Sequence, residues 1–363
     1  MRVVVVGAGA IGCATAFVLA DRGVGVLIID RSTAGSGASG AAAGMLAPFS
    51  ESPQRGPVFE AGAEALTEFA AWRSAVEDAA GVDLEVSAAG SLVVAGDTKQ
   101  ADELRSRLLW QAEVDPTNEW IDEAGLKTLA PHLRPGVLGA LHYPMEMQVN
   151  AALYTRILAN AAVARGARLK EGTPVRSLLT KGDRITGVQL DGKRVSADAV
   201  VLAPGADAGL LQQAQLRLPL GPVKGELIRL RPALQVPRLL LRAPGGYLAP
   251  TADGSVIVGA TQLPGRNDLT VAAESASSLL NFATALVPAL REATFIGAWA
   301  GLRPTLPDHI PAVGPAPGHP GLWLAVGHHR DGILLAGWTG RRLASAMLDG
   351  DLLPEAMLPA RFG

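Results

Sequence analysis

The stretch Val3-Val-Val-Val-Gly7-Ala-Gly9-Ala-Ile-Gly12 near the N-terminus decides the fold class. Its first four residues are β-branched, which is typical of a strand that is covered on both faces. An apolar helical pattern follows the three glycines and continues to Ala20. A second apolar run, Val24 to Ile29, ends at Asp30 and completes a β-α-β unit of about thirty residues. The sequence therefore predicts an α/β protein with a Rossmann-like domain at its start.

The glycine spacing predicts a dinucleotide site at this first turn. A Gly-x-Gly-x-x-Gly pattern between a strand and a helix permits a tight turn, close approach of the backbone to a pyrophosphate, and close helix packing. Asp30 stands 18 residues after Gly12, where a carboxylate can accept a hydrogen bond from a ribose hydroxyl. A turn with a purely structural role is disfavoured, because the strand, the helix and the acidic residue all occur at the positions that a dinucleotide-binding motif requires. The pattern alone does not choose between FAD and NAD.

Composition excludes several classes of protein. The length of 363 residues corresponds to two ordinary domains or one two-lobed enzyme, at about 150 residues per domain. Hydrophobic residues make up 48% of the chain and charged residues 18%, which excludes intrinsic disorder. The 32 basic and 34 acidic residues give a formal charge of −2, so we expect no nucleic-acid partner.

The number of cysteines, the length of the apolar runs and the spacing of the histidines indicate where the protein is located and whether it binds a metal. Cys13 is the only cysteine, so the chain forms no internal disulfide, and we expect a reducing, cytoplasmic compartment. No run of about 18 apolar residues occurs, so we expect no membrane association. No metal-ligand spacing surrounds His328 and His329, so we expect no metal. Assembly as a homo-oligomer stays open.

Capping and turn residues delimit further expected elements. Asn150 predicts the N-cap of a helix that ends near Gly166. Three strand-like runs then follow and are expected to form an antiparallel meander through Gly-Asp and Asp-Gly turns: Val175–Leu179, Ile185–Leu190 and Ala199–Leu202. The remaining expected elements are a hairpin and two helices: Tyr247–Ala249 with Val256–Val258, Leu279–Leu286 before Pro288, and Gly332–Leu348.

The run Gly35 to Met45 has almost no side-chain bulk. Such a stretch lets the backbone lie against a flat ring. A flexible surface loop is the alternative, but such loops usually carry charge, and this run continues into the apolar Met45-Leu46-Ala47-Pro48. The pattern therefore favours a flavin over a nicotinamide as the ring that it contacts.

Three motifs together resemble one known family. The string Ser39-Gly-Ala-Ala-Ala-Gly-Met-Leu-Ala-Pro closely resembles the flavin-contacting loop of the glycine oxidase branch of the D-amino-acid oxidase family of FAD enzymes. Val223-Lys-Gly-Glu with the Tyr247 hairpin agrees with that family. So does Ala300-Gly-Leu-Arg-Pro with Gly327-His-His-Arg-Asp-Gly-Ile-Leu-Leu-Ala. The resemblance extends from Val3 to about Leu348.

The resemblance implies a Rossmann-like FAD-binding domain that is interleaved with a smaller substrate domain built on a mixed or antiparallel sheet. The FAD-binding domain is then discontinuous, with residues 1–82, 149–220 and 302–363. The substrate-binding domain takes residues 83–148 and 221–301.

The resemblance also implies which residues contact FAD. These are Gly7, Gly9, Ala10, Ile11, Gly12, Asp30, Arg31, Ala38, Ser39, Ala43, Gly44, Met45, Val175 (through its backbone), His329, Gly332, Ile333 and Leu334. The helix expected near Gly332 would aim its free N–H groups at the flavin edge that becomes negative on reduction. Covalently linked relatives use a cysteine near the C-terminus or a histidine near the N-terminus. Since the chain offers only Cys13, and His132 as its first histidine, we expect non-covalent FAD.

Three residues are the candidates for substrate binding and catalysis. Arg303 matches the family's carboxylate anchor, because the planar guanidinium binds both oxygens of a carboxylate. A surface salt bridge is the alternative, which the apolar surroundings from Trp299 to Pro307 disfavour. Tyr247 matches the tyrosine that closes over the carboxylate, with a core tyrosine as its alternative. Arg330 matches a position near flavin and substrate.

These features predict an FAD-dependent oxidase of glycine or N-substituted glycines. Hydride transfer from the α-carbon to FAD would give an imine, and hydrolysis would give glyoxylate with ammonia or an amine. The partners are a small amino acid with a free carboxylate and, as the expected acceptor, molecular oxygen, which would yield hydrogen peroxide. The alternatives are a D-amino-acid dehydrogenase, a sarcosine oxidase and an inactive flavin-binding scaffold.

Three departures from the family pattern bear on the substrate. Gly245-Gly246 stands before Tyr247 where bulkier residues are common, and Gln262 stands where an apolar residue is expected. Gly337-Trp338 replaces a proline and a small residue. The small groups before Tyr247 predict a wider pocket and therefore a larger substituent on the glycine nitrogen.

Overall fold

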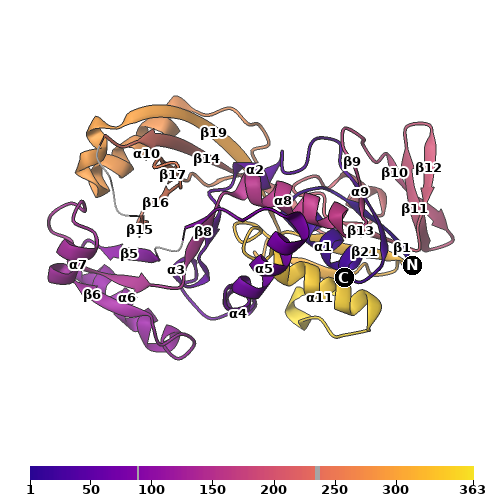
Figure 1. The fold of residues 1–363 in the computed structure, drawn as a ribbon, viewed down its shortest axis with the longest axis horizontal. Coiled ribbons are helices and arrows are strands. Elements are labelled where there is room, and N and C mark those ends of the chain that lie inside the picture. The colour runs from indigo at the N-terminus through magenta and orange to yellow at the C-terminus, as the bar shows by residue number, and fades with distance from the viewer. Residues whose placement is uncertain (88–89, 234–237) are drawn as a thin grey trace.

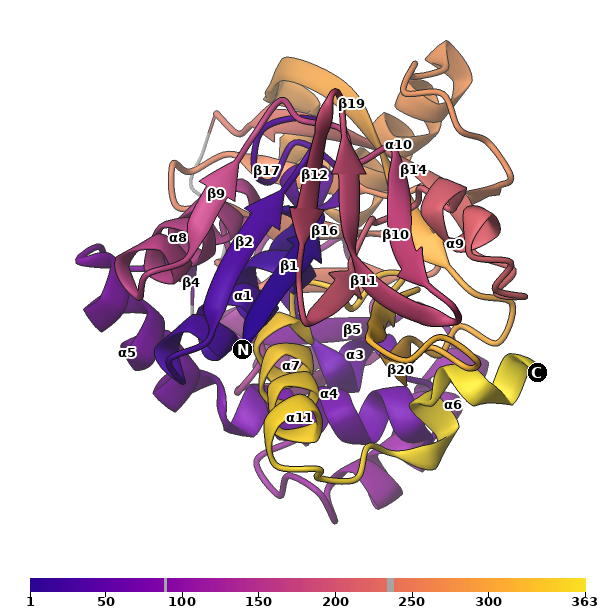
Figure 2. The same ribbon diagram turned by 90° about the vertical axis from the view of Figure 1, so that its right-hand side faces the viewer.

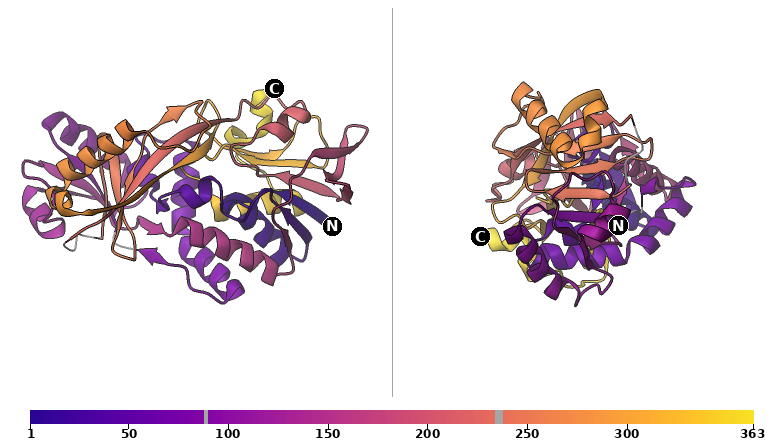
Figure 3. Two further views of the ribbon diagram at one scale, coloured as in Figure 1. Left: turned by 90° about the horizontal axis from the view of Figure 1, so that it is seen from above. Right: turned by 90° about the vertical axis from the view of Figure 1, so that its left-hand side faces the viewer.

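The computed structural model describes residues 1–87, 90–233 and 238–363. Figure 1 shows two lobes side by side, and Figure 3 shows them from above and from one end. One lobe holds both termini and a six-stranded sheet, and the other holds a nine-stranded sheet. Parallel and antiparallel strand pairs occur together with helices, which confirms the predicted α/β class.

The six-stranded sheet has the order β20-β21-β13-β1-β2-β9. All neighbouring strands are parallel except β20 and β21. The bounds are β1 (Arg2–Val6), β2 (Gly25–Ile29), β9 (Arg168–Lys170), β13 (Ala199–Leu202), β20 (Ala312–Pro315) and β21 (Leu322–Val326). Helix α1 (Ala10–Asp21) connects β1 to β2. The predicted β-α-β unit is therefore confirmed, with β1 near the middle of the sheet.

Helices cover one face of this sheet. Helix α1 lies between α8 (Ala151–Ala164) and α11 (Ala336–Leu348), and α5 (Phe69–Ala80) packs on α8. The Asn150 side chain accepts a hydrogen bond from the Leu153 N–H at 3.2 Å, which confirms the predicted cap of α8. The apolar core between these helices includes Phe17, whose ring meets that of Trp72 edge-on at 5.5 Å.

A three-stranded antiparallel sheet covers the other face (Figure 2). Its strands are β10 (Ser177–Lys181), β11 (Arg184–Leu190) and β12 (Lys193–Ser196). The predicted meander is right for its first two strands and wrong for its third. Residues 199–202 form β13, which is buried at every position and pairs in parallel with β1. The chain instead turns at Asp191-Gly192 into the polar β12, which has no apolar pattern to reveal it.

The second lobe is built on the nine-stranded sheet, in the order β18-β14-β17-β16-β15-β5-β7-β6, with β19 also paired to β14. The bounds are β5 (Ser91–Ala95), β6 (Glu119–Asp122), β7 (Gly139–Tyr143), β14 (Gly221–Arg231), β15 (Leu240–Ala243), β16 (Gly246–Pro250), β17 (Val256–Gly259), β18 (Leu263–Pro264) and β19 (Thr294–Thr305). The predicted hairpin is confirmed as β16 and β17. The helix expected at residues 279–286 is the second half of α10 (Ala273–Leu286).

A small sheet of order β3-β8-β4 lies where the lobes meet (Figure 1). Its strands are β3 (Met45–Leu46), β8 (Met147–Val149) and β4 (Val86–Ser87). The remaining helices are α2 (Ala38–Ala41), α3 (Pro48–Glu51), α4 (Pro57–Thr67), α6 (Thr98–Gln111), α7 (Glu123–Leu129), α9 (Gly209–Gln213), η1 (Pro288–Glu292), η2 (Glu355–Met357) and η3 (Pro359–Phe362). Within the described ranges, no helix has the length and apolar character needed to cross a membrane.

Candidate active site

The first glycine turn is fixed by steric limits. Gly7 has φ +109° and donates its N–H to the carbonyl of Ile29 at 2.9 Å. A Cβ on Gly7 would lie 2.1 Å from the Ala203 carbonyl oxygen, so no other residue fits. A Cβ on Gly12 would lie 2.0 Å from the Gly7 oxygen. Gly12 therefore lets α1 pack directly on the turn.

The N-terminus of α1 faces the groove that this turn opens. Gly9 occupies the N-cap position and, as glycine, has no side chain with which to cap the helix. The Ala10 N–H donates to Ser39 Oγ at 3.0 Å, which joins the helix start to the small-residue loop. Helix N-termini carry unpaired N–H groups and partial positive charge, and both favour a phosphate.

Asp30 follows β2 and holds its carboxylate beside the glycine turn. One carboxylate oxygen accepts from the Ala8 N–H at 2.7 Å and the other from the Ser32 N–H at 2.8 Å. The neighbouring Arg31 forms an exposed ion pair with Asp207 at 2.6 Å. The carboxylate is therefore fixed in orientation and still has lone pairs for a hydroxyl donor.

The groove has a volume of about 410 Å³. The predicted cofactor residues that line it are Gly7, Gly9, Ala10, Ile11, Asp30, Arg31, Ala38, Ser39, His329, Gly332 and Ile333. Ala43, Gly44 and Met45 line a neighbouring cavity instead. Gly12, Val175 and Leu334 line neither space. Val175 lies two residues after Thr173, whose N–H donates to the Asp30 carbonyl at 2.8 Å, so its backbone is close to Asp30 in the fold.

The small-residue loop forms the wall between the two spaces. Gly44 has φ +81°, and a Cβ there would lie 1.9 Å from the Val149 carbonyl oxygen. The Val149 N–H donates to the Gly44 carbonyl at 2.9 Å, and Gln148 Nε2 donates to the Ala43 carbonyl at 2.8 Å. These bonds hold the loop against β8. It is therefore a fixed wall, as the sequence pattern indicated, and not a flexible surface loop.

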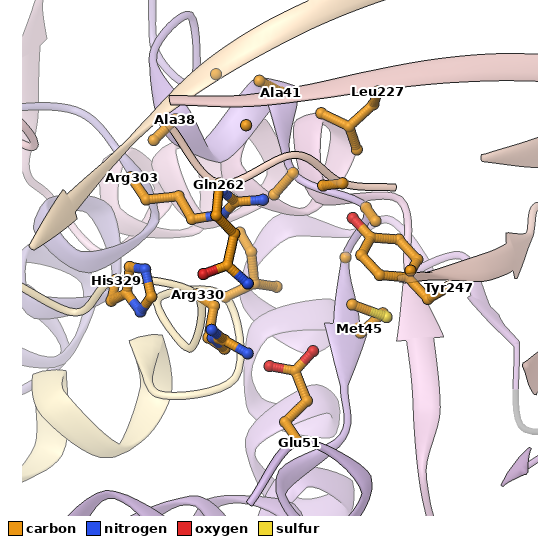
Figure 4. A pocket seen from close by; sticks show the side chains of 18 of the residues that line it. Ala38, Ala41, Met45, Glu51, Leu227, Tyr247, Gln262, Arg303, His329 and Arg330 are labelled. Atoms are coloured by element: carbon orange, nitrogen blue, oxygen red, sulfur yellow. The ribbon is translucent and has the colours of Figure 1, made fainter. Parts of the chain in front are cut away.

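The neighbouring cavity, drawn in Figure 4, has a volume of about 370 Å³. Such a volume is within the range of small-molecule pockets, ~300–1,000 Å³. It shares part of its lining with the groove: Ala38, Ala41, Ala42, Gly301, His329, Arg330 and Ile333. The two spaces are therefore contiguous, and a flat ring in the groove would border a small molecule in the cavity.

Arg303 projects into this cavity from β19. Its guanidinium lies against Gly225, where a Cβ would be 2.4 Å from Nη2, so β14 must carry glycine at this point. Nη1 donates to the Thr261 carbonyl at 3.2 Å. Burial lowers the pKa of Arg303 from its ordinary value, yet arginine keeps its charge in proteins. Within the described residues no carboxylate pairs with Arg303, so it offers a fixed cation to the cavity.

Tyr247 lies on the opposite side of the cavity, on β16 (Figure 4). Its ring rests on Gly259, where a Cβ would be 2.3 Å from the phenol oxygen. Burial raises the pKa of Tyr247 to about 12, and the nearby Arg303 partly opposes that rise. The phenol is therefore protonated at neutral pH and can donate a hydrogen bond to a carboxylate bound at Arg303.

The turn that connects β21 to α11 supplies backbone donors. The predicted helix from Gly332 is wrong by four residues: α11 begins at Ala336, and a single turn, closed by the Leu335 N–H to the Asp331 carbonyl at 2.8 Å, precedes it. The N–H groups of residues 332–334 make no backbone hydrogen bond within the described chain. Gly332 and Ile333 line the groove, so their N–H groups lie at its wall, whereas Leu334 lines neither space.

The two adjacent histidines have different surroundings. His328 is buried in the core, with Nε2 at 3.0 Å from Thr339 Oγ1. Burial lowers the pKa of His328 to about 3. His329 lines both spaces, and its buried Nε2 has no hydrogen-bond partner. Burial, Arg330, Arg303 and His309 lower its pKa to about 3, so both imidazoles are neutral at pH 7.

Arg330 and Gln262 border the cavity near Arg303 (Figure 4). Both side chains are exposed to solvent. Within the described part of the chain, the Arg330 guanidinium forms no ion pair or hydrogen bond. The structure therefore brings together all three predicted catalytic residues.

Sequence reasoning missed an ion pair in the same cavity. Arg242 Nη1 lies 2.6 Å from Glu51 Oε1, and both side chains are largely buried. The Arg242 guanidinium also lies 5.7 Å from the centre of the Tyr247 ring. The Gly245-Gly246 turn was a usable signal for Arg242, because it closes a further hairpin in which β15 pairs Arg242 directly with Tyr247. Nothing in the local sequence marked Glu51.

Glu146 supports this pair from below the cavity. It is fully buried, and its carboxylate accepts from the Ser50 N–H at 2.7 Å and from the Ser91 hydroxyl. Burial raises the pKa of Glu146 to about 7. These bonds fix the helix end that carries Glu51.

The sequence departures separate into two groups. Gly245, Gly246 and Gln262 line the cavity. Trp338 instead donates from Nε1 to Glu64 at 2.9 Å, and a Cβ on Gly337 would lie 2.6 Å from the Trp72 ring. The second group is therefore a packing feature that bears on helix contacts and not on the ligand. Among the residues with described positions, no cluster of three or more His, Cys, Asp or Glu side chains could hold a metal ion.

Comparisons with known proteins agree on one family. The family described as FAD dependent oxidoreductase (DAO) matches residues 2–346. The glycine oxidase of Geobacillus kaustophilus is 34% identical over 348 residues, which cover 94% of this chain and 91% of that protein. Its crystal structure superposes with a TM-score of 0.92 at 32% identity, over 100% of this chain and 98% of that one. The crystal structure of iminodiacetate oxidase (IdaA) from Chelativorans sp. BNC1 gives a TM-score of 0.91 at 27% identity, over 99% of each chain.

Proposed function

Because this chain belongs to the FAD dependent oxidoreductase (DAO) family, we propose that it is an FAD-dependent oxidase of glycine or N-substituted glycines. The carrying observation is the carboxylate clamp of Arg303 and Tyr247, in a cavity that opens directly onto the dinucleotide groove. The D-amino-acid dehydrogenase, sarcosine oxidase and scaffold alternatives are not favoured, because relatives that are 34–36% identical to this chain are glycine oxidases.

The groove residues fit FAD. The glycine turn and the start of α1 suit a pyrophosphate, and the fixed Asp30 carboxylate suits a ribose hydroxyl. The small-residue loop suits a flat ring, and His329 lines the same space. Val175 would contribute its backbone, while Gly12 would act through helix packing. Cys13 is buried in the core of α1 and cannot reach the groove, which supports non-covalent binding.

The strand distribution supports the discontinuous domains. All strands of the six-stranded sheet fall within residues 1–82, 149–220 and 302–363. The nine-stranded sheet falls within residues 83–148 and 221–301, apart from the last residues of β19. Arg303 is among these last residues, so the anchor stands where the two proposed domains join.

Bound FAD supplies the two-electron oxidant. The chain supplies orientation: Arg303 binds both carboxylate oxygens of the substrate, and the Tyr247 hydroxyl donates to one of them. This clamp fixes the α-carbon relative to the wall that the cavity shares with the groove. The N–H groups of Gly332 and Ile333 would place partial positive charge near that wall, which favours arriving electrons.

The cavity also favours the neutral form of the substrate amine, which is the form that can lose hydride. Three arginines and one glutamate line the cavity, and His329 is neutral. Net positive charge around an amine lowers its pKa. The amine can therefore release its proton without a dedicated side-chain base.

We expect molecular oxygen as the electron acceptor. The experiment is to follow oxygen consumption, hydrogen peroxide and glyoxylate when purified holoenzyme receives glycine, sarcosine, N-ethylglycine or D-alanine. The proposal expects glyoxylate and peroxide in equal amounts from the glycines. Flavin reduction without oxygen consumption would make the enzyme a dehydrogenase. An absence of both reactions with every compound would contradict the proposed function.

A further inference from the structure

The charges that line the cavity do not balance. Its charged side chains are Glu51, Arg242, Arg303 and Arg330. Glu51 and Arg242 form a largely buried ion pair at 2.6 Å and neutralise each other. Arg303 and Arg330 therefore remain, and together they give the cavity two uncompensated positive charges. His329 adds none, because its pKa is lowered to about 3.

Asp331 does not compensate Arg330. Its side chain forms no ion pair within the described residues, and it is not part of the cavity lining. Burial and the nearby Glu51 raise the pKa of Asp331, while Arg330 and Arg242 lower it. The Arg330 guanidinium therefore faces the cavity and solvent without a bound carboxylate.

Arg303 and Arg330, which form no ion pair within the described residues, lie at different places in the cavity and cannot both bind one carboxylate in the same geometry. Arg303 is half-buried, tied to the Thr261 carbonyl, and opposed by the Tyr247 hydroxyl. Arg330 is exposed and comes from the turn after β21, on the side of the cavity away from Tyr247 (Figure 4). The Gln262 amide points into the cavity near both arginines (Figure 4). One carboxylate in the Arg303 clamp leaves Arg330 and the Gln262 amide without partners.

The cavity has room for a substituent that could reach them. Ala243, Gly245 and Gly246 contribute almost no side-chain volume to its wall. A Cβ on Gly246 would lie 2.5 Å from the Gly259 carbonyl oxygen, so the wall at this point is set by the backbone. The space is therefore a fixed property of the hairpin between β15 and β16.

We propose that the preferred substrate is a glycine whose nitrogen carries a short substituent ending in a second acidic group, with Arg330 and Gln262 as the specificity-determining pair. The inference rests on the proposed function. Arg303 and Tyr247 would hold the carboxylate of the oxidised glycine unit, and Arg330 would hold the acid on the nitrogen substituent. Two anionic groups match the two uncompensated charges, and charge-assisted hydrogen bonds are the stronger ones. Iminodiacetate is the simplest compound of this class.

The reaction balances with oxygen as the acceptor. The oxidised carbon loses a hydride and the nitrogen a proton, and water then adds to the resulting C=N bond and breaks the C–N bond. Oxygen takes up the two electrons and two protons as hydrogen peroxide. Iminodiacetate, oxygen and water thus give glyoxylate, glycine and hydrogen peroxide.

The test compares two substrates that differ only in charge. Iminodiacetate and its monoamide, N-(carbamoylmethyl)glycine, have nearly the same shape, but the amide group is neutral and cannot form an ion pair with a guanidinium. With wild-type holoenzyme we expect kcat/KM for iminodiacetate to exceed that for the monoamide by about tenfold, mostly through KM, since a hydrogen bond to a charged group contributes ~1.5 kcal/mol.

Variants assign this preference to the two residues. Arg330→Gln is expected to reduce the ratio to about one with FAD still bound, since one charged hydrogen bond to the second acid is lost. Arg330→Lys should restore part of the ratio because it restores the charge. Gln262→Leu should reduce the ratio by about threefold, the effect of a neutral hydrogen bond. Arg291→Gln, an exposed arginine on η1 outside both spaces, is the matched control.

Three results would overturn the inference and leave the proposed function standing. Equal kcat/KM for iminodiacetate and its monoamide in wild type would show that the enzyme does not recognise a second acidic group. An equal loss for all substrates in Arg330→Gln would assign Arg330 to the flavin or to the fold. A ratio unchanged in Arg330→Gln would place the second acid elsewhere. Failure of every glycine-type compound to reduce the flavin would instead contradict the proposed function.

Discussion

Glycine and alanine are common in the lining of both the 410 Å³ groove and the 370 Å³ cavity beside it, but the cavity also carries three arginines, a glutamate, a tyrosine and a glutamine. At the glycine turn of the groove a ligand would meet the main chain, so the residues there are limited by steric space. In the cavity a ligand would meet charged and polar side chains, so charge decides what binds there. Changes in the groove should therefore remove the cofactor, and changes in the cavity should change turnover while the cofactor stays bound.

Gly9→Val should have the largest effect of the series, a loss of FAD affinity, and it tests the difference between the groove and the cavity most directly. A Cβ on Gly9 meets only Ser39 Oγ, at 3.2 Å, so the apoprotein should fold with a melting temperature within a few degrees of wild type. The larger side chain blocks the approach of a pyrophosphate to the backbone. FAD affinity should fall by at least about a hundredfold, ~2.7 kcal/mol, in a flavin titration of apoprotein.

Gly297→Val is the matched control for this variant. Gly297 lies on β19, outside both spaces, and a Cβ there meets nothing within 4 Å. It should keep wild-type FAD affinity. Retention of wild-type affinity by Gly9→Val itself would mean that the groove does not hold the pyrophosphate at this turn.

Arg303→Leu should have the next largest effect and separate the cavity from the groove. Loss of the buried anchor should lower kcat/KM by about a thousandfold, ~4 kcal/mol, because the substrate carboxylate then has no fixed cation. FAD content and the flavin spectrum should stay as in wild type. Arg303→Lys should recover part of the activity, since it keeps the charge but not the two-pronged geometry. Full activity in Arg303→Leu would show that the anchor lies elsewhere.

His328→Gln tests the contribution of the core histidine to stability, whereas its neighbour His329 lines the groove. The pKa of His328 is about 3 in the folded protein, below the usual 6.5, so the unfolded chain binds more protons between these values. The contribution of the neutral His328 imidazole to the free energy of unfolding is complete above pH 6.5 and is lost as the pH falls towards 3. Between pH 6 and 4, the stability of wild type relative to the variant should fall by about 1.4 kcal/mol per pH unit in urea titrations.

His329 and Glu146 are present in both proteins of that comparison, so their contributions cancel. Activity and FAD content of His328→Gln should stay near wild type at pH 7, because His328 pairs with Thr339 and not with a ligand. A stability difference that is independent of pH would contradict the assignment of His328 as a buried neutral imidazole.

Tyr247→Phe should have the smallest effect of the series. It removes one hydrogen bond to the substrate carboxylate and leaves the Arg303 pairing, so kcat/KM should fall by about tenfold through KM. Since the pKa of Tyr247 is raised to about 12, no tyrosine ionisation should appear in the wild-type pH profile at physiological pH. An unchanged KM in the variant would assign the phenol to packing on Gly259.

The sequence predicted the groove better than the cavity, for a physical reason. The glycine turn, Asp30 and the Asn150 cap each act within a few residues or one β-α-β unit, so local patterns reveal them. The pair of Arg242 and Glu51 joins residues 191 positions apart, and only the folded chain brings them together. Its one local signal was the hairpin register that places Arg242 opposite Tyr247.

The two wrong element predictions have the same kind of cause. Residues 199–202 and β11 both look like buried strands, but only tertiary packing decides that 199–202 joins β1 in the large sheet. The apolar run from Gly332 suits a helix throughout, yet its first residues form a separate turn before α11. In both places the local pattern was compatible with two structures, and the fold selected one.

The most direct test of the central claim is a single anaerobic turnover. Wild-type holoenzyme and Arg303→Leu, each with FAD bound, are mixed with sarcosine without oxygen, and flavin reduction and glyoxylate are measured together. The account predicts one glyoxylate per flavin reduced in wild type, and reduction slower by about a thousandfold in the variant at low substrate. Equal reduction rates in the two proteins, or reduction without glyoxylate, would contradict it.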